Sequence, residues 1–277
     1  MDDVKNLKFS SINKFARATE HIPEMIKQIK ILKEKGFAYQ AEDGVYFDIS
    51  KFEDYGKLAK RTVKQAEDGV SRIDESVNKK NKGDFALWKF SKEGKPEWES
   101  PWGKGRPGWH IEDTAITEKY LGRQYDLHGG GQDLIFPHHE AEIAQQESAS
   151  GQKPFVKYWL HSGFVTINGQ KMSKSLANFI TVKNILKKHT PQALRFMIIG
   201  AYYRSPIDYK ENLIKKSEAA IQRIQELLGK LEMIRNGPKE SSFAPPTPLV
   251  SEGHSKAMED KGKIEFDEII KNTKSYK

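Results

Sequence analysis

Apolar residues recur at helical spacing near the N-terminal end of the chain. They are Ile22, Met25, Ile26, Ile29 and Leu32, and most positions between them are polar. Pro23 falls in the first turn of this pattern and Gly36 follows its last member, and both are typical of the start and the end of a helix. The pattern predicts one amphipathic helix that buries a single face.

Two segments combine strand-forming residues with a turn pair that contains glycine. The first, FAYQAEDGVYFDI, turns at Asp43-Gly44, and the second, FVTINGQK, turns at Asn168-Gly169. Such pairs predict β-hairpins with two-residue type I′ turns. Residues 53–84, in contrast, are charged and show little apolar periodicity, so we expect helix and loop on the surface there.

Three more helices follow from the pattern in the second half of the chain. Residues 139–149 are expected to be helical, with the end before Gly151. Thr190 and Pro191 suit the N-cap and the first position of the next helix. From residue 209 to 234, apolar residues keep a helical period with Lys, Arg and Glu between them, which predicts one long helix.

Composition narrows the class of protein. The 277 residues include 46 Lys and Arg against 38 Asp and Glu, and the net charge of +8 indicates a polyanionic partner or simply a lysine-rich solvated surface. The absence of cysteine excludes disulfides, thiolate metal ligands and a cysteine nucleophile within this chain. No stretch reaches the roughly 20 apolar residues of a membrane span, and the N-terminus lacks the apolar run of a secretory signal, so we expect a cytoplasmic protein.

Residues suited to a shaped site are concentrated in the middle of the chain. All five tryptophans and five of the eight histidines lie between positions 88 and 161, and ten of the 21 glycines lie between 103 and 169. Because large rings, imidazoles and permissive backbone are the components of a ligand site, we expect the chemistry in this third of the chain.

The segment HGGGQDLIFPHHEAE, residues 128–142, carries the first candidate chemistry. Its three glycines follow a predicted strand and allow either a close approach of the backbone to a ligand or a tight turn. Asp133 is placed to accept hydrogen bonds from a ribose or an amine. His138 and Glu142 are four residues apart at the start of a helix, which suits a Zn²⁺ ligand pair, although a surface hydrogen bond is the commoner role of such a pair.

The segment QKMSKSLANF, residues 170–179, offers a second candidate. Lys171 and Lys174 lie three apart with two serines beside them, in a loop between a hairpin and a helix. Ammonium groups and hydroxyls suit a triphosphate, because they offset its charge and donate hydrogen bonds. An ordinary solvated loop is the alternative for this segment taken alone.

The segment GRPGWHIEDTA, residues 105–115, is the third candidate. Its glycines and proline predict a turn that delivers Trp109, His110 and Asp113 to one place. Trp109 is either an ordinary core residue or the wall of a small-ligand pocket, because an indole presents an apolar face.

Together these segments resemble the cysteinyl-tRNA synthetases, a family of class I aminoacyl-tRNA synthetases. The matching stretches are RATEHIPEMI, DFALWK, SPWGKGRPGWHIE, HGGGQDLIFPHHEAEIAQ, KMSKS and YYRSPIDY, and the match as a whole spans roughly residues 17–235. The resemblance implies an α/β fold: part of the Rossmann-like nucleotide-binding fold of class I synthetases, with a connecting insertion and the start of a helical bundle.

The resemblance also implies a division of the chain. The connecting insertion would take residues 1–99, and the second half of the Rossmann-like catalytic domain, with the KMSKS loop, residues 100–202. Residues 203–235 would form the first helix of the bundle and residues 236–277 a linker and tail. The turn-rich stretch WESPWGKGRPG marks the first boundary.

The activity implied is ligation of cysteine to tRNA(Cys), through ATP-dependent formation of cysteinyl-adenylate. Cysteine, ATP with Mg²⁺ and tRNA(Cys) would be the partners. By the resemblance, Lys171 and Lys174 bind the ATP phosphates and stabilise the transition state of adenylate formation, and Trp109 walls the cysteine pocket. The residues that would line the adenylate site are His128, Gly129, Gly130, Gly131, Asp133 and Lys174.

His138 and Glu142 match two ligands of the family's Zn²⁺, which contacts the substrate thiol. The family has a cysteine ligand where this chain has Asp113, and another near the N-terminus. Asp113, His138 and Glu142 are therefore predicted to form a metal site that is harder than the family's and holds Zn²⁺ more weakly.

A second departure concerns the ends of the chain. The family's first Rossmann half, with the HIGH motif, should precede residue 17, where only 16 residues without histidine stand. This predicts a partial chain of a longer synthetase. Two alternatives stay open: a non-catalytic remnant that binds tRNA or regulates, and a related ligase that joins cysteine to an amino sugar.

Overall fold

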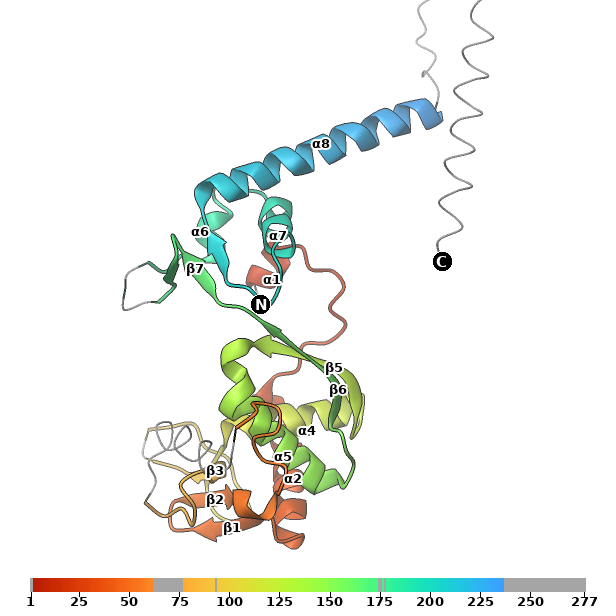
Figure 1. Cartoon of the computed structure of the whole chain (residues 1–277). Helices are drawn as coiled ribbons and strands as arrows, with labels where there is room; N and C mark the ends of the chain where they lie inside the picture. The colour runs from red at the N-terminus through yellow and green to blue at the C-terminus, as the bar shows by residue number, and fades with distance from the viewer. Residues whose placement is uncertain (1, 62–76, 93, 174–175, 177, 237–277) are drawn as a thin grey trace, which may run out of the picture. The chain divides into compact units, whose positions relative to one another are not determined.

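The computed structural model describes residues 2–61, 77–92, 94–173, 176 and 178–236 (Figure 1). The chain divides into two units, Met1–Glu226 and Leu227–Lys277, and the described part of the second unit is the end of one long helix. No helix among the described residues is long and apolar enough to cross a membrane.

The predicted N-terminal helix is present as α2 (Ile22–Glu34). Its apolar face is fully buried at Met25, Ile29 and Leu32. That face packs against α4 (Trp109–Leu121) and α5 (Glu140–Ser150), and the three helices contact one another (Figure 1). The apolar face that the 3.6-residue period predicts is thus buried against two helices from the middle of the chain.

Four antiparallel strands form the first sheet, in the order β1 (Ala38–Ala41), β2 (Gly44–Phe47), β3 (Phe85–Phe90) and β4 (Gly105–Pro107). The predicted hairpin exists, but the turn prediction is wrong: Ala41 pairs with Gly44, so the turn lies at Glu42-Asp43. Gly44 belongs to β2, where a Cβ would stand 2.3 Å from the Trp88 carbonyl oxygen. This glycine therefore permits the close approach of β3.

One hydrophobic core unites residues on both sides of position 100. Val45, Phe47 and Leu87 belong to it together with Ile111 and Ala144. Strand β4 also pairs with β3 across that position. The predicted division of the chain at residue 99 thus does not coincide with a break in packing, and it remains a prediction about the family's segments.

Residues 62–76 lie outside the described residues, and in the rest of the segment 53–84 the expected surface character is wrong at four buried positions, two of which have large or charged side chains. Tyr55 is 3% exposed and belongs to the core, and Asp84 is fully buried. The Asp84 carboxylate accepts hydrogen bonds from the Tyr39 hydroxyl, the Ile49 amide and Asn81. These donors offset the cost of burying its charge, which a linear pattern does not reveal.

A parallel pair, β5 (Tyr125–Gly131) and β6 (Val156–Ser162), flanks α5 in the chain and forms a β–α–β unit. Helix α5 begins after a wide turn at Ile135–His139 and ends at Gly151 in the left-handed conformation, within a residue of the predicted bounds. The three glycines 129–131 lie inside β5, so the expectation that they follow the strand is wrong. The parallel pairing confirms the α/β class.

A further sheet and most of the remaining helices follow β6. Strand β7 (Val165–Ile167) pairs with β8 (Gln170–Lys171) and β9 (Ile207–Tyr209). The predicted turn at Asn168-Gly169 is confirmed, with φ values of 50° and 78°. The helices of this part, and α1 at the N-terminus, are α1 (Asp2–Asn6), α6 (Val182–Ile185), α7 (Pro191–Ile199) and α8 (Glu211–Asn236). Thr190 caps α7 as predicted, because its hydroxyl accepts a hydrogen bond from the Ala193 amide.

Candidate functional site

Five histidines meet beside the β5–β6 pair, and we call them the imidazole cluster. They come from α4, β5, the turn before α5, and β6: His110, His128, His138, His139 and His161. The ring centroids of neighbouring members lie 4.8 to 5.6 Å apart. The fold thus assembles in space the histidines that the sequence concentrates between positions 88 and 161.

The structure brings together the three residues predicted as metal ligands. His138 Nε2 lies 2.9 Å from Asp113 Oδ2 and 2.8 Å from Glu142 Oε1. We call Asp113, His138 and Glu142 the first triad. On the other side of the ring, His138 Nδ1 lies 2.7 Å from Nδ1 of His110, which fixes the orientation of the imidazole. Trp109 stacks on His138 with ring centroids 4.3 Å apart, so it is a wall of this site although 54% of it is exposed.

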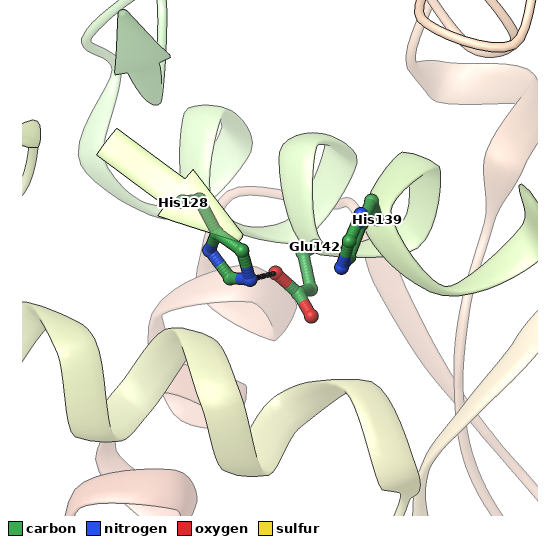
Figure 2. Close-up of side chains that lie close together, drawn as sticks. All are labelled: His128, His139 and Glu142. Atoms are coloured by element: carbon green, nitrogen blue, oxygen red, sulfur yellow. Dashed lines mark ion pairs between the residues drawn. The ribbon is translucent and has the colours of Figure 1, made fainter. Parts of the chain in front are cut away.

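Glu142 has a second imidazole contact. Its Oε2 lies 3.7 Å from His128 Nε2, and Figure 2 shows its carboxylate between the rings of His128 and His139. Both carboxylate oxygens are buried and accept no hydrogen bond of regular geometry. Buried polar atoms are rarely left in this state, so the carboxylate is suited to a cation.

The charges of the site differ sharply between neighbouring rings. Burial lowers the pKa of His138, but the contacts with Asp113 and Glu142 outweigh this and raise its pKa to about 9. Burial raises the pKa of Glu142 to about 7 against the effect of His138. Burial and nearby imidazoles lower the pKa of His110 and of His139 to about 3. Near neutral pH, His138 is therefore the charged imidazole beside the neutral rings of His110 and His139, and the Glu142 carboxyl group is only partly ionised.

The residues predicted to line the adenylate site lie at the end of β5. Gly130 is close to the cluster, because a Cβ there would stand 2.7 Å from Cε1 of His139. Gly129 and Gly131 extend the same strand, and Asp133 is exposed in the short turn that follows. The ring of His128 is turned toward Glu142, and its main chain lies within β5, where it pairs with Trp159 of β6.

The predicted phosphate-binding lysines are placed differently. Lys171 is exposed in β8, with its Nζ 4.6 Å from the centroid of the Phe164 ring rather than on the imidazole cluster. Asn178 holds the start of the loop, because its side chain donates to the Lys171 carbonyl and accepts from the Ser173 amide. Lys174 lies outside the described residues.

Several residues that shape the site were missed by sequence reasoning. Tyr125 bonds His128, His161 bonds His139, and Trp159 stacks on His128. The concentration of Trp and His in this region was the only signal for Trp159 and His161, and nothing in the sequence pattern pointed to Tyr125. Within the described part of the chain, two groups of side chains can hold a metal ion: Asp113, His138 and Glu142, and also His128, His139 and Glu142.

The sequence of most of the chain matches known proteins. Residues 1–219 match a family model described as the catalytic domain of tRNA synthetases class I (C). A Cysteine–tRNA ligase of Thermoplasma volcanium is 53% identical over 233 residues, 84% of this chain and 51% of the relative. One of Geobacter sp. (strain M21) is 54% identical over 216 residues, 78% of this chain and 45% of the relative. The chain thus spans about half the length of the curated relatives it matches.

A solved structure shares the fold. It is a methionyl-tRNA synthetase of Mycobacterium tuberculosis in complex with methionyl-adenylate, with a TM-score of 0.56 and 16% identity. The match covers 78% of this chain and 52% of that chain. At this identity, the likeness concerns the fold alone.

Proposed function

This chain belongs to the family of class I (C) tRNA synthetase catalytic domains, and from that premise we propose that it serves cysteine–tRNA ligation. The family match confirms the predicted resemblance and the predicted fold class. The observation that carries the proposal is the first triad, Asp113, His138 and Glu142, in which the last two side chains are buried and Trp109 stacks on His138, in a chain so similar to curated cysteine–tRNA ligases.

The proposed reaction has two steps. The cysteine carboxylate attacks the α-phosphorus of ATP, which forms cysteinyl-adenylate and releases pyrophosphate. A ribose hydroxyl at the end of tRNA(Cys) then attacks the adenylate carbonyl carbon, and AMP leaves. Both steps shift negative charge between oxygens, so the protein contributes by positioning and by fixed charges. As a step of protein synthesis, the reaction belongs to the cytoplasm.

The end of β5 is the proposed adenylate site. Ligands of open parallel sheets bind at the carboxyl ends of the strands. There, Gly129, Gly130 and Gly131 offer backbone without side chains, His128 its main chain, and Asp133 an exposed carboxylate.

The first triad is the proposed cysteine-recognition site. One imidazole and two carboxylates suit Zn²⁺, and the buried oxygens of Glu142 without regular hydrogen bonds fit this role. Bound there, Zn²⁺ would supply a thiophilic Lewis acid that distinguishes a thiol from the hydroxyl of serine. Trp109 would cover the side chain of the substrate, because its indole stacks over His138 at the edge of the triad.

The KMSKS loop is the proposed phosphate-binding part. Lys171, exposed in β8, and Lys174 would offset the charge that ATP, bound with Mg²⁺, develops during adenylate formation.

The test is cysteine-dependent exchange of pyrophosphate into ATP. Lys174→Ala is expected to lower the exchange rate roughly 100-fold or more, with little change in cysteine affinity, because the charge acts mainly in the transition state. Lys183→Ala, an exposed lysine of α6, is the matched control and should exchange normally. An unchanged rate in Lys174→Ala would contradict the role of the loop.

The acceptor is tested separately. Transfer of cysteine to tRNA(Cys) supports the ligase proposed here, whereas transfer to an amino sugar would point to the related ligase. A purely RNA-binding remnant has less support from charge, because residues 210–236 hold six Lys and Arg against four Glu, a net of +2.

A further inference from the structure

A second potential metal site shares Glu142 with the first triad. We propose that His128, His139 and Glu142, the second triad, bind a further divalent transition-metal ion of the Zn²⁺ class. The ligand atoms of these three residues all lie within 4.8 Å of one another. This site goes beyond the proposed function, which uses only the first triad.

The carboxylate of Glu142 has two sides, and each serves a different set of ligands. Its Oε1 faces His138 of the first triad at 2.8 Å, and its Oε2 faces His128 of the second triad at 3.7 Å. The carboxylate thus lies between two groups of donors in the manner of a bridging ligand. Oε1 is ion-paired with His138, whereas Oε2 is buried with only the 3.7 Å contact to His128 and accepts no hydrogen bond of regular geometry, so a cluster without metal leaves Oε2 unsatisfied.

A hydrogen bond at Nδ1 orients the ring of each histidine of the second triad. The Tyr125 hydroxyl bonds Nδ1 of His128, and Nε2 of His161 lies 2.8 Å from Nδ1 of His139. Each ring therefore keeps Nε2 as the nitrogen that can coordinate. Metal-binding histidines are typically held in this way by a second partner.

Packing fixes the positions of the two rings. Trp159 stacks on His128 with centroids 4.8 Å apart and a 29° angle, and Gly130 makes room for His139, which is 1% exposed. The His128 side chain is 15% exposed, so an ion can reach the site from its side. The triad is thus preorganised, with a route of entry.

The donor set determines the class of ion. Two imidazole nitrogens and one carboxylate oxygen suit Zn²⁺, Co²⁺ or Ni²⁺, whereas Mg²⁺ and Ca²⁺ prefer oxygen alone. Three protein ligands leave one position of a tetrahedral ion open, as in catalytic zinc sites.

The experiment is a metal count on the purified full chain. After equilibration with Zn²⁺ and removal of weakly held ion, we expect about two zinc ions per chain. His139→Gln should retain about one, Asp113→Asn about one, and Glu142→Gln close to none, since each triad loses a ligand in turn. His21→Gln is the matched control, because this buried imidazole bonds a backbone carbonyl and the Tyr120 hydroxyl instead of a carboxylate, and it should retain about two.

The outcomes separate this inference from the proposed function. About one zinc ion in the wild type, unchanged in His139→Gln, would overturn the second site. One ion that survives Asp113→Asn and is lost in His139→Gln would support the second site and contradict the zinc of the first triad. His128→Gln repeats the test should His139→Gln unfold, as judged by circular dichroism. A Co²⁺ titration of the wild type, followed by visible absorption, should break at about two equivalents.

Discussion

The imidazole cluster and the hairpin of β7 and β8 hold polar groups in opposite ways. In the cluster, buried rings are each oriented by a second side chain, as His110 orients His138 and His161 orients His139. In the hairpin, Lys171 is exposed and contacts one aromatic ring. Recognition of a small chemical group needs protein atoms that packing holds in place. The charge of a phosphate, in contrast, can be neutralised by long, positively charged side chains on the surface.

The two regions also differ in what supports them. The cluster is carried by α4, β5, the turn that leads into α5, and β6, and the helices α4 and α5 share the large core with α2. The hairpin is held locally, because Asp208 of β9 accepts hydrogen bonds from the Thr166 hydroxyl and the Gly169 amide, at 2.9 and 2.8 Å. A loss of packing in the core should therefore disturb the imidazole cluster more than it disturbs the hairpin.

The largest expected effect tests this difference in support. Ile29→Ala empties a fully buried position of the core and should lower the free energy of unfolding by about 2–5 kcal/mol. Val165→Ala in β7, where the residue is 42% exposed, is the counterpart and should cost less than about 1 kcal/mol. Urea denaturation measures both, and equal losses would show that the two regions rest on one common support.

Much of the fold was predictable because its signals are local. The helical period of α2, the turn at Asn168-Gly169 and the capping of α7 by Thr190 each depend on residues close in sequence. The same holds for His138 and Glu142, whose spacing alone places them on one face.

What could not be predicted depends on distant partners. Gly44 suggested a turn, but its role is set by β3, some forty residues away. The glycines of β5 lack the alternation of a strand, and only their parallel pairing with β6 makes them one. Likewise, the second triad needs Tyr125 and His161, which no spacing connects to Glu142.

Two glycines, one from each region, sharpen the comparison at the backbone. Gly130→Ala should cost about 1–3 kcal/mol, because the added Cβ would press on the ring of His139. Gly169→Ala should cost about 1–2 kcal/mol for another reason: its φ is +78° and nothing lies within 4 Å of an added Cβ.

Asparagine distinguishes the two causes. Gly169→Asn should recover most of the loss, since asparagine tolerates a left-handed backbone, and Gly130→Asn should not, since it adds still more bulk. Thermal unfolding of the four variants is the measurement. Recovery at both positions would mean that Gly130 is not constrained by packing.

The effect of pH on stability, smallest near neutrality, tests whether burial controls the charge of the cluster. Burial lowers the pKa of His139 to about 3, below the value of about 6.5 expected in the unfolded chain. Between these values the unfolded state binds the extra proton, so His139 should remove up to about 1.4 kcal/mol of stability for each pH unit of acidification. As pH falls below 6.5, the free energy of unfolding of the wild type should therefore decrease more steeply than that of His139→Gln. Urea denaturation with a chelator present measures both. Gly129→Ala adds no titratable group and only an ordinary contact with Leu160, so its curve should run parallel to the wild type. A pH-independent difference for His139→Gln would mean that its imidazole takes up the proton as readily in the folded chain as in the unfolded one.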